Sequence, residues 1–232
     1  MITGWFRSLF DTIFPARCAV CSSALARGEQ TICTSCRWDM PLTDYWSVHE
    51  NFMVERFAGR LPFAEASALM FFRRQSHYRD LIHRMKYGAR RDVALMLGEV
   101  YGRYLHDSEL YRGVELVVPV PLHYSKFIKR GYNQSEEFAR GVAHAMGAQL
   151  QTKALVRTRR TRTQARLKDS QARALNVENA FRVTRVDLLA GRGILVVDDV
   201  VTTGATIEAA AGAIARAVGD ATLYLGAIAI VK

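Results

Sequence analysis

A long aliphatic run that ends in two adjacent acids is the feature that most constrains this chain. Residues 194–197 read Ile-Leu-Val-Val, Asp198 and Asp199 follow, and a loop of small and hydroxyl residues leads into an alanine-rich segment. An aliphatic run without polar alternation is typical of a strand that is buried on both faces of a sheet. Open α/β sheets bind ligands at the carboxyl ends of such strands. We therefore expect a ligand site at the two acids.

The loop after the acids has the composition of a phosphate site. Thr202, Thr203 and Thr206 offer hydroxyl groups, Gly204 allows a positive φ, and a helix is predicted over residues 205–218. Backbone N–H groups at the start of this helix and the helix dipole favour a bound anion. The two acids instead accept hydrogen bonds from vicinal hydroxyls. A phosphate at the loop and a diol at the acids together describe a ribose 5-phosphate.

Two other interpretations of this segment are weaker. A response-regulator receiver also contains a Val-Val-Asp-Asp segment, but it needs most of its fold after the acids, and only residues 200–232 follow here. A buried strand with an acidic end and no ligand would leave the composition of the loop unexplained.

All four cysteines lie within nineteen positions near the N-terminus. They form two CxxC pairs, Cys18 with Cys21 and Cys33 with Cys36, and eleven residues separate the pairs. Two such knuckles place four thiolates around one tetrahedral zinc, and a closed four-thiolate site is structural. Disulfides are the alternative, which is disfavoured because nothing in the sequence suggests secretion. We predict a small zinc ribbon with structural Zn2+ in a reducing, cytoplasmic environment.

The formal net charge of +10 on 232 residues is concentrated in three clusters. They are Arg73, Arg74, Arg79, Arg84, Lys86, Arg90 and Arg91; Lys126, Lys129 and Arg130; and Arg157, Arg159, Arg160, Arg162, Arg166, Lys168 and Arg173. Clustered positive charge attracts polyanions, so nucleic acid and a pyrophosphate substrate both fit, and a solvated cationic surface is the alternative for any single residue. The apolar stretch 221–231 is too short to span a bilayer, which takes about 20 residues. Residues 1–15 have the spacing of an amphipathic helix and lack the continuous apolar region of a signal peptide.

Strands and helices alternate along the predicted chain, which is typical of the α/β class with a parallel sheet. The predicted strands are residues 66–72, 114–120, 149–156, 194–197 and 222–231, and the predicted helices are residues 79–85, 92–106, 134–146 and 205–218. The aromatic region 45–72 is either core or the wall of a second ligand site. We expect an N-terminal helix and zinc ribbon over residues 1–45 and an α/β domain over residues 46–232.

Further motifs give nearly the whole chain a resemblance to a known family. They are Val117-Val118-Pro119-Val120-Pro121-Leu122-His123, Lys129-Arg130-Gly131-Tyr132-Asn133-Gln134-Ser135, Thr163-Gln164-Ala165-Arg166-Leu167, Arg173, Asn176 and Ala180-Phe181. These motifs and the order of parts resemble the competence protein F (ComF) family. Residues 194–206 resemble the signature with which type I phosphoribosyltransferases bind 5-phosphoribosyl 1-pyrophosphate (PRPP). The resemblance implies a bacterial cytoplasmic protein with a type I phosphoribosyltransferase-like sheet flanked by helices. It also implies an association with DNA uptake in natural transformation, although members named for gluconate utilisation leave the pathway open.

The resemblance implies roles for individual residues. Asp198 and Asp199, with Arg162 and Arg166 of a loop that closes over the substrate at about residues 158–173, are the candidate catalytic residues. The candidate PRPP-binding residues are Val200, Val201, Thr202, Thr203, Gly204, Ala205, Thr206, Pro121, Leu122, His123, Lys126 and Arg130. Mg2+ is expected to bind with the PRPP, because this ion rarely occupies a cage made of protein alone.

Two classes of function remain open. The first is an enzyme that transfers the phosphoribosyl group to an unknown acceptor, or that binds PRPP. The second is an accessory factor that binds single-stranded DNA by stacking and charge. Its candidate residues are Tyr124, Phe127, Tyr132, Lys126, Lys129 and Arg130. The paired acids favour the first, since a DNA site gains nothing from acids beside its phosphates. An adaptor that docks proteins of the DNA-uptake machinery through the ribbon is a third possibility.

Overall fold

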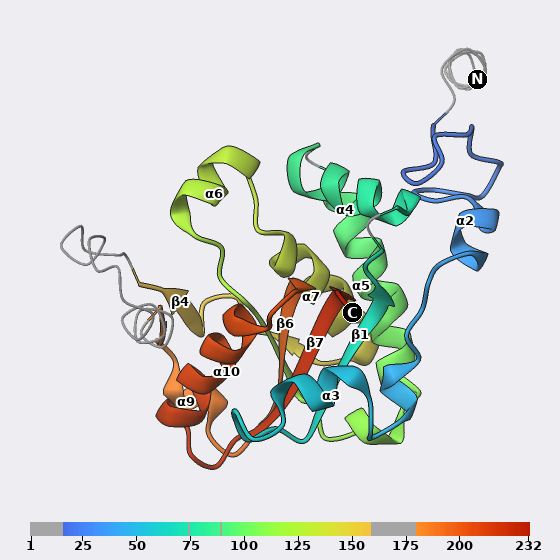
Figure 1. Cartoon of the computed structure of the whole chain (residues 1–232). Coiled ribbons are helices and arrows are strands. Elements are labelled where there is room, and N and C mark those ends of the chain that lie inside the picture. The colour runs from blue at the N-terminus through green and yellow to red at the C-terminus, as the bar shows by residue number, and fades with distance from the viewer. Residues whose placement is uncertain (1–15, 74, 89, 159–179) are drawn as a thin grey trace, which may run out of the picture.

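A five-stranded sheet forms the centre of the molecule, and its strand pairs are all parallel (Figure 1). The computed structural model describes residues 16–73, 75–88, 90–158 and 180–232. In spatial order the strands are β1 (Glu65–Phe71), β7 (Thr222–Ile230), β6 (Gly193–Val201), β2 (Leu116–Pro119) and β3 (Gln149–Leu150). The predicted α/β class with a parallel sheet is confirmed.

Helices cover both faces of the sheet, so the molecule has three layers (Figure 1). One face carries α4 (His77–Tyr87), α5 (Arg91–His106) and α7 (Gln134–Met146), and the other carries α3 (Phe52–Phe57), α9 (Val186–Leu189) and α10 (Ala205–Ala217). Leu195 and Val197 of β6 belong to the first core, whereas Ile194 and Val196 belong to the second. Burial on both sides explains why this strand shows no polar alternation.

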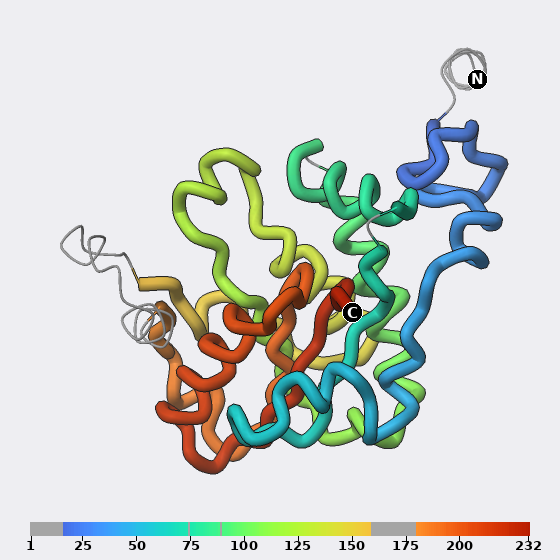
Figure 2. Tube along the Cα trace, in the orientation of Figure 1, coloured from blue at the N-terminus to red at the C-terminus, as the bar shows by residue number. Residues whose placement is uncertain are grey.

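The four-cysteine segment lies at the edge of the body beside α4 and α5, as the blue part of the trace shows (Figure 2). It contains the short helix α2 (Thr34–Trp38). Tyr78 Oη of α4 donates a hydrogen bond to the carbonyl oxygen of Cys36. Arg84 Nη1 donates to Ala19 O and to Ser22 Oγ, each at 3.2 Å. Helix α4 therefore joins this segment to the sheet, and the domain boundary at residues 45 and 46 stays a prediction.

The predicted strand 149–156 is wrong as a single element. Residues 152–153 form a turn, so the segment divides into the two-residue β3 of the main sheet and β4 (Leu155–Arg157). Strand β4 pairs antiparallel with β5 (Phe181–Val183) in a separate ribbon. The predicted closing loop comes between these two strands in the sequence. Its residues 159–173 are outside the described part of the chain, as are residues 1–15 with their predicted helix.

Several short elements were not predicted. They are η1 (Tyr45–Ser47), α3, η2 (Glu109–Tyr111) and α6 (Tyr124–Arg130). Helix α6 stands away from the sheet opposite α4 (Figure 1). In the described ranges, no helix is both long enough and apolar enough to cross a membrane.

Helices α5 and α7 cross closely because glycines replace side chains where they meet. A Cβ atom added to Gly98 would lie 2.2 Å from Phe138 O, and one added to Gly141 would lie 2.2 Å from Leu95 O. Both atoms in the way belong to the backbone, so the helices would have to separate. The contact holds α7, and with it the residues at the N-terminal end of α7, at a fixed height over the sheet.

We expect Gly141→Ala to lower the free energy of unfolding by more than about 2 kcal/mol, because overpacking against backbone costs more than the helix propensity of alanine returns. Gly212→Ala in α10 is the matched control. The nearest atom to its new Cβ is the flexible Arg216 Nη1 at 3.3 Å, so its effect is expected to lie between zero and about 1 kcal/mol of stabilisation. Urea unfolding followed by circular dichroism measures both, and equal effects would contradict the close crossing.

Candidate functional site

A cavity of about 560 Å³ opens where β1, β2, β6 and β7 end, and it is lined by residues of α4 and α6. Its lining residues come from β6, α4 and α6, from the segments that directly follow β1, β2, β6 and β7, and from α7, α10 and β4. They are Phe72, Arg79, Ile82, His83, Lys86, Val120, Pro121, Leu122, Lys126, Arg130, Ser135, Arg157, Asp198, Asp199, Val200, Thr202, Thr206 and Val231. The carboxyl ends of parallel strands are where open α/β sheets bind ligands. We call this cavity the main pocket.

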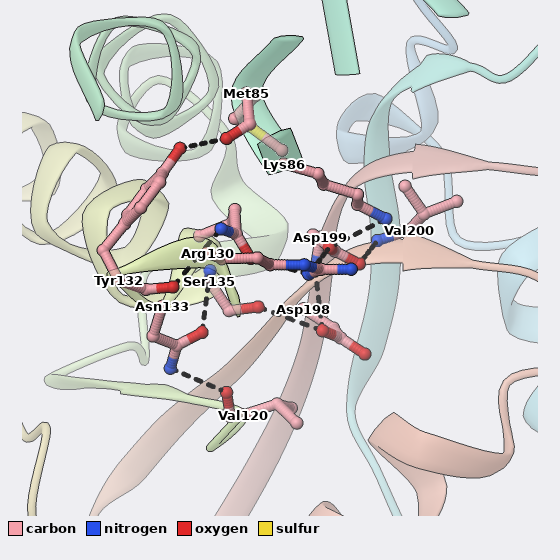
Figure 3. Close-up of polar contacts among 11 residues, drawn as sticks. Met85, Lys86, Val120, Arg130, Tyr132, Asn133, Ser135, Asp198, Asp199 and Val200 are labelled. Carbon is pink, nitrogen blue, oxygen red and sulfur yellow. Dashed lines mark hydrogen bonds and ion pairs between the residues drawn. The ribbon is translucent and has the colours of Figure 1, made fainter. Parts of the chain in front are cut away.

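Asp198 lies in the main pocket within a network of hydrogen bonds (Figure 3). Its Oδ1 accepts from Ser135 Oγ at 3.0 Å and from the backbone N–H of Asp199 at 2.8 Å. Asn133 accepts from Ser135 N at 3.2 Å and donates to Val120 O at 3.1 Å. Burial, with the neighbouring Asp199 charge as a second cause, raises the pKa of Asp198 to about 7. The Asp198 carboxyl therefore changes between its protonated and ionised forms near neutral pH.

Asp199 has the opposite surroundings, because two cations converge on it (Figure 3). Lys86 Nζ lies 2.9 Å from Asp199 Oδ2, and Arg130 Nη1 lies 3.8 Å from the same oxygen. The Arg130 side chain is 8% exposed, and its Nη1 also donates to Gln134 Oε1 at 2.7 Å. The two adjacent acids therefore differ, because Asp198 has a raised pKa whereas Asp199 forms ion pairs.

The loop between β6 and α10 has the backbone shape that the sequence predicts. Gly204 caps α10 with φ 86°, and a Cβ there would lie 2.5 Å from a ring carbon of Phe57. Only glycine meets both conditions without strain. Thr202 and Thr206 line the main pocket, whereas Thr203 Oγ1 accepts from the backbone N–H of Ala205 at 3.5 Å. Strand β6 runs on through both acids to Val201, beyond the predicted end at residue 197.

The proline turn after β2 brings some of the predicted residues to the main pocket. Pro121 and Leu122 line it, together with Lys126 and Arg130 of α6. His123 instead lines a neighbouring cavity of about 350 Å³ and caps α6, where its Nδ1 accepts from Ser125 N at 3.2 Å.

The other predicted residues either do not line the main pocket or lie outside the part of the chain that the structure describes. Val201, Gly204 and Ala205 shape the loop and do not line the cavity. Arg162 and Arg166 lie outside the described residues. In the aromatic region 45–72, Trp46 and Phe57 are buried, and most of the other rings pack against the core. Of these rings, only Phe72 lines the main pocket.

Several residues that line the main pocket were not predicted as site residues, and Lys86 is the most important of them. It counted only as one cation of a basic cluster, because its partner Asp199 is distant in sequence. Ser135 was visible only as the end of a motif. Arg79, Ile82, His83 and Val231 also line the cavity. Their spacing along the predicted helix is the signal that could have placed Arg79, Ile82, His83 and Lys86 on one side of it.

The aromatic set proposed for DNA stacking is wrong in one member. Tyr132 is 4% exposed, its hydroxyl donates to Met85 O, and the Arg91 guanidinium lies over its ring at 5.1 Å. Tyr124 and Phe127 of α6 are exposed, at 65% and 47%.

The four cysteine sulfur atoms form one cluster, in which all lie within 4.8 Å of one another. Cys21 Sγ and Cys33 Sγ are 3.8 Å apart, which is the separation of two tetrahedral ligands at a Zn–S distance of about 2.3 Å. The backbone N–H groups of Val20 and Cys33 point at Cys18 Sγ, at 3.4 and 3.3 Å. Such hydrogen bonds stabilise a thiolate. No disulfide links these cysteines, and the donor set fits a structural zinc.

We expect Asp198→Asn to stabilise the protein in a pH-dependent way. Its pKa, raised from 3.8 to about 7, means that the folded protein keeps a proton that the unfolded chain releases. Stability from that proton is complete below pH 4 and is lost as the pH rises to 7. The variant should therefore match the wild type at pH 4 and exceed it by about 4 kcal/mol at pH 8, since one pKa unit corresponds to about 1.4 kcal/mol. Denaturant unfolding at the two pH values tests this. Asp199→Asn is expected to lower stability at pH 8, because it leaves Lys86 without its ion-pair partner.

The purified protein should contain about one zinc per chain, because four thiolates complete one tetrahedral site. Cys21→Ser is expected to lose most of that metal and to lower the midpoint of thermal unfolding. Ser35→Ala, an exposed change in the same segment, is the control. Elemental analysis by mass spectrometry measures the content, and a full zinc complement in Cys21→Ser would contradict the four-thiolate site.

Comparisons with known proteins agree with this architecture. Residues 9–45 match the double zinc ribbon domain family. The DNA utilization protein YhgH of Escherichia coli O157:H7 is 30% identical over 82% of this chain and 80% of its own length. Competence protein F of Haemophilus influenzae is 31% identical over 40% of this chain and 41% of its own. A solved structure of the allosteric regulatory enzyme of purine biosynthesis matches 62% of this chain and 30% of its own, with 17% identity and a TM-score of 0.42. That likeness is too weak to carry an argument.

The relative that matches over four fifths of both chains, the zinc ribbon and the helix-covered parallel sheet agree with one another. The chain therefore belongs to the family of these DNA utilization and competence proteins, the competence protein F (ComF) family, and carries a zinc ribbon before a parallel α/β sheet.

Proposed function

We propose that the main pocket binds PRPP or a related ribose phosphate. The observation that carries the proposal is the meeting of two acids and a threonine loop at one cavity of about 560 Å³. Thr202, Thr206 and the backbone N–H groups at the start of α10 receive the 5-phosphate. Asp198 and Asp199 accept hydrogen bonds from the ribose hydroxyls.

The pyrophosphate of this ligand is assigned to the cationic side of the pocket. Lys86, Lys126 and Arg130 line that side together with the Pro121–Leu122 turn. If Lys86 and Arg130 exchange their ion pairs with Asp199 for contacts with the pyrophosphate oxygens, both cations bind the ligand. Mg2+ bound together with this ligand would add positive charge at the pyrophosphate, and Asp198 and Asp199 are the described lining acids that could contact it, since two carboxylates do not form a cage by themselves.

The reaction that we propose for this site is phosphoribosyl transfer. The bond between the anomeric carbon and the pyrophosphate oxygen breaks, and its electron pair leaves with pyrophosphate through an oxocarbenium-like state. The nucleophilic atom of the acceptor bonds to the anomeric carbon and gives up its proton, if it carries one, to water. Cations that hold the leaving group stabilise this state most. We assign Arg162 and Arg166 to the same task on the basis of the family resemblance alone.

The relatives carry names that refer to DNA utilization and to competence. We infer from them that this protein acts in the uptake or processing of DNA, and its place in the cytoplasm stays a prediction. The second candidate function is a non-catalytic factor for single-stranded DNA, or an adaptor for uptake proteins. The exposed Tyr124 and Phe127 beside Lys126 and Lys129 favour it, since rings and cations together bind single strands.

Isothermal titration of the zinc-loaded protein with PRPP and Mg2+ tests the first function. The double variant Asp198→Asn/Asp199→Asn is expected to weaken binding at least about 100-fold, or about 2.7 kcal/mol, because both hydroxyl acceptors lose their charge. The matched control removes the same charge from exposed acids outside the pocket, as Asp187→Asn/Asp220→Asn.

Competition with single-stranded DNA separates the two functions. Absence of PRPP binding, with oligonucleotide binding that falls steeply with salt, would reject the phosphoribosyl site and support the DNA module. The exposed rings are then the place to look, and Phe127→Ala should weaken the oligonucleotide but leave any PRPP affinity unchanged.

A further inference from the structure

We propose that Arg60 is a positioning residue for the bound phosphate, and that it acts by neutralising Glu208 so that a phosphate monoester can bind at the start of α10. Arg60 lies in the turn after α3 and does not line the main pocket. This inference rests on the proposed function, because it assumes that the 5-phosphate of a ribose binds beside Thr202 and Thr206. It adds to that site a residue from a distant part of the sequence.

Glu208 places a negative charge close to the proposed phosphate. It belongs to the first turn of α10, the helix whose N–H groups are assigned to that phosphate. Without a ligand, an acid in this turn is favourable for the helix dipole, but it repels an anion that binds at the same end of the helix. A phosphate monoester carries nearly two negative charges at neutral pH. Its binding therefore requires a cation that offsets Glu208.

The guanidinium of Arg60 supplies this cation. Its Nε donates to Glu208 Oε1 at 3.2 Å, and its Nη2 donates to Glu208 Oε2, so the two side chains form a bidentate ion pair. Its Nη1 donates to Arg56 O, in the last turn of α3, at 3.1 Å. Bidentate pairs of arginine and carboxylate combine charge with a fixed geometry. Because these contacts direct the guanidinium at Glu208, Arg60 acts through that acid and not as a ligand of the phosphate.

The contact of Arg60 with the loop itself is weak. Its Nη1 also donates to Thr203 O, but at the long distance of 3.5 Å. The loop has a stronger support on the same face of the sheet, where α3 and α10 both lie (Figure 1). There the buried Phe57 ring packs against Gly204 so closely that a Cβ atom on Gly204 would lie 2.5 Å from it. We infer that charge, and not the shape of the loop, is the main contribution of Arg60.

The two members of the pair should have opposite effects on the affinity for ribose 5-phosphate. Arg60→Gln leaves the Glu208 charge without compensation and is expected to weaken binding at least about fivefold. Glu208→Gln leaves the Arg60 charge without compensation and is expected to tighten binding about twofold or more. The double variant keeps the net charge of the wild type and should bind within about twofold of it. If the pair only held the loop in place, all three variants would lose affinity.

Titration calorimetry of the full-length, zinc-loaded protein with ribose 5-phosphate, and separately with PRPP and Mg2+, measures these affinities. The matched control is the ion pair of Arg192 with Glu115, at 2.7 Å, because the Arg192 side chain is 43% exposed and that of Arg60 is 40% exposed. Arg192 and Glu115 directly precede β6 and β2, at the opposite edge of the sheet from the main pocket. Arg192→Gln and Glu115→Gln change the net charge equally, and each should change affinity less than about twofold.

Thermal unfolding without ligand shows whether the variants are folded, and their midpoints should lie close to that of the wild type, since a partly exposed ion pair contributes little to stability. If Arg60→Gln did not fold, the sign of the effect of Glu208→Gln would still decide the question.

The role of Arg60 is overturned, and the phosphate site stands, if Arg60→Gln keeps the wild-type affinity. Weaker binding by Glu208→Gln, or a double variant that binds as weakly as Arg60→Gln, leads to the same conclusion. If the wild-type protein binds neither ribose 5-phosphate nor PRPP, the proposed function fails and the role of Arg60 fails with it.

Discussion

The pairing of β6 on both of its edges is the constraint on which the pocket depends. Val197 is in register with Pro119 of β2 and with Gly226 of β7, and the pairing with β7 continues through Asp198 to Val201. The proline turn, the acids and the end of the chain therefore reach one edge of the sheet together. A parallel sheet with both faces covered is buried throughout, so this edge is the place where polar groups of all three strands remain accessible.

Asp198 and Asp199 are adjacent in the sequence but have different electrostatic surroundings. Asp199 is balanced by Lys86 and Arg130, which themselves lie mostly out of solvent. Asp198 relies on neutral partners, the Ser135 hydroxyl and a backbone N–H. Burial makes the ionised form of Asp198 less favourable in the folded protein than it is in water. A ligand that donates hydrogen bonds to it, or a metal ion beside it, would return that free energy as binding affinity, as is common where stability is given up at a functional site.

Local pattern predicted the elements that are long and periodic, and it failed where distant partners decide the structure. The helix Gln134–Met146 was predicted with its bounds, because Asn133 caps it and Gly147 ends it in the left-handed region. Helix α6 was missed, since Tyr124, Phe127 and Ile128 face solvent and leave no buried stripe to detect. At the site, the acids and the loop were predicted because they adjoin in sequence. Lys86 could not be predicted, since its contact with Asp199 joins two elements across more than a hundred residues.

Helix α4 touches the zinc ribbon with one side and the main pocket with the other. Tyr78 and Arg84 hydrogen-bond to backbone and side-chain groups of the cysteine segment, and Lys86 reaches Asp199 from the last turn of the same helix. The ribbon thus acts as a mechanical anchor for one wall of the pocket. Because one helix makes both sets of contacts, the cysteine segment and this wall of the pocket share one support, although no residue of that segment lines the pocket.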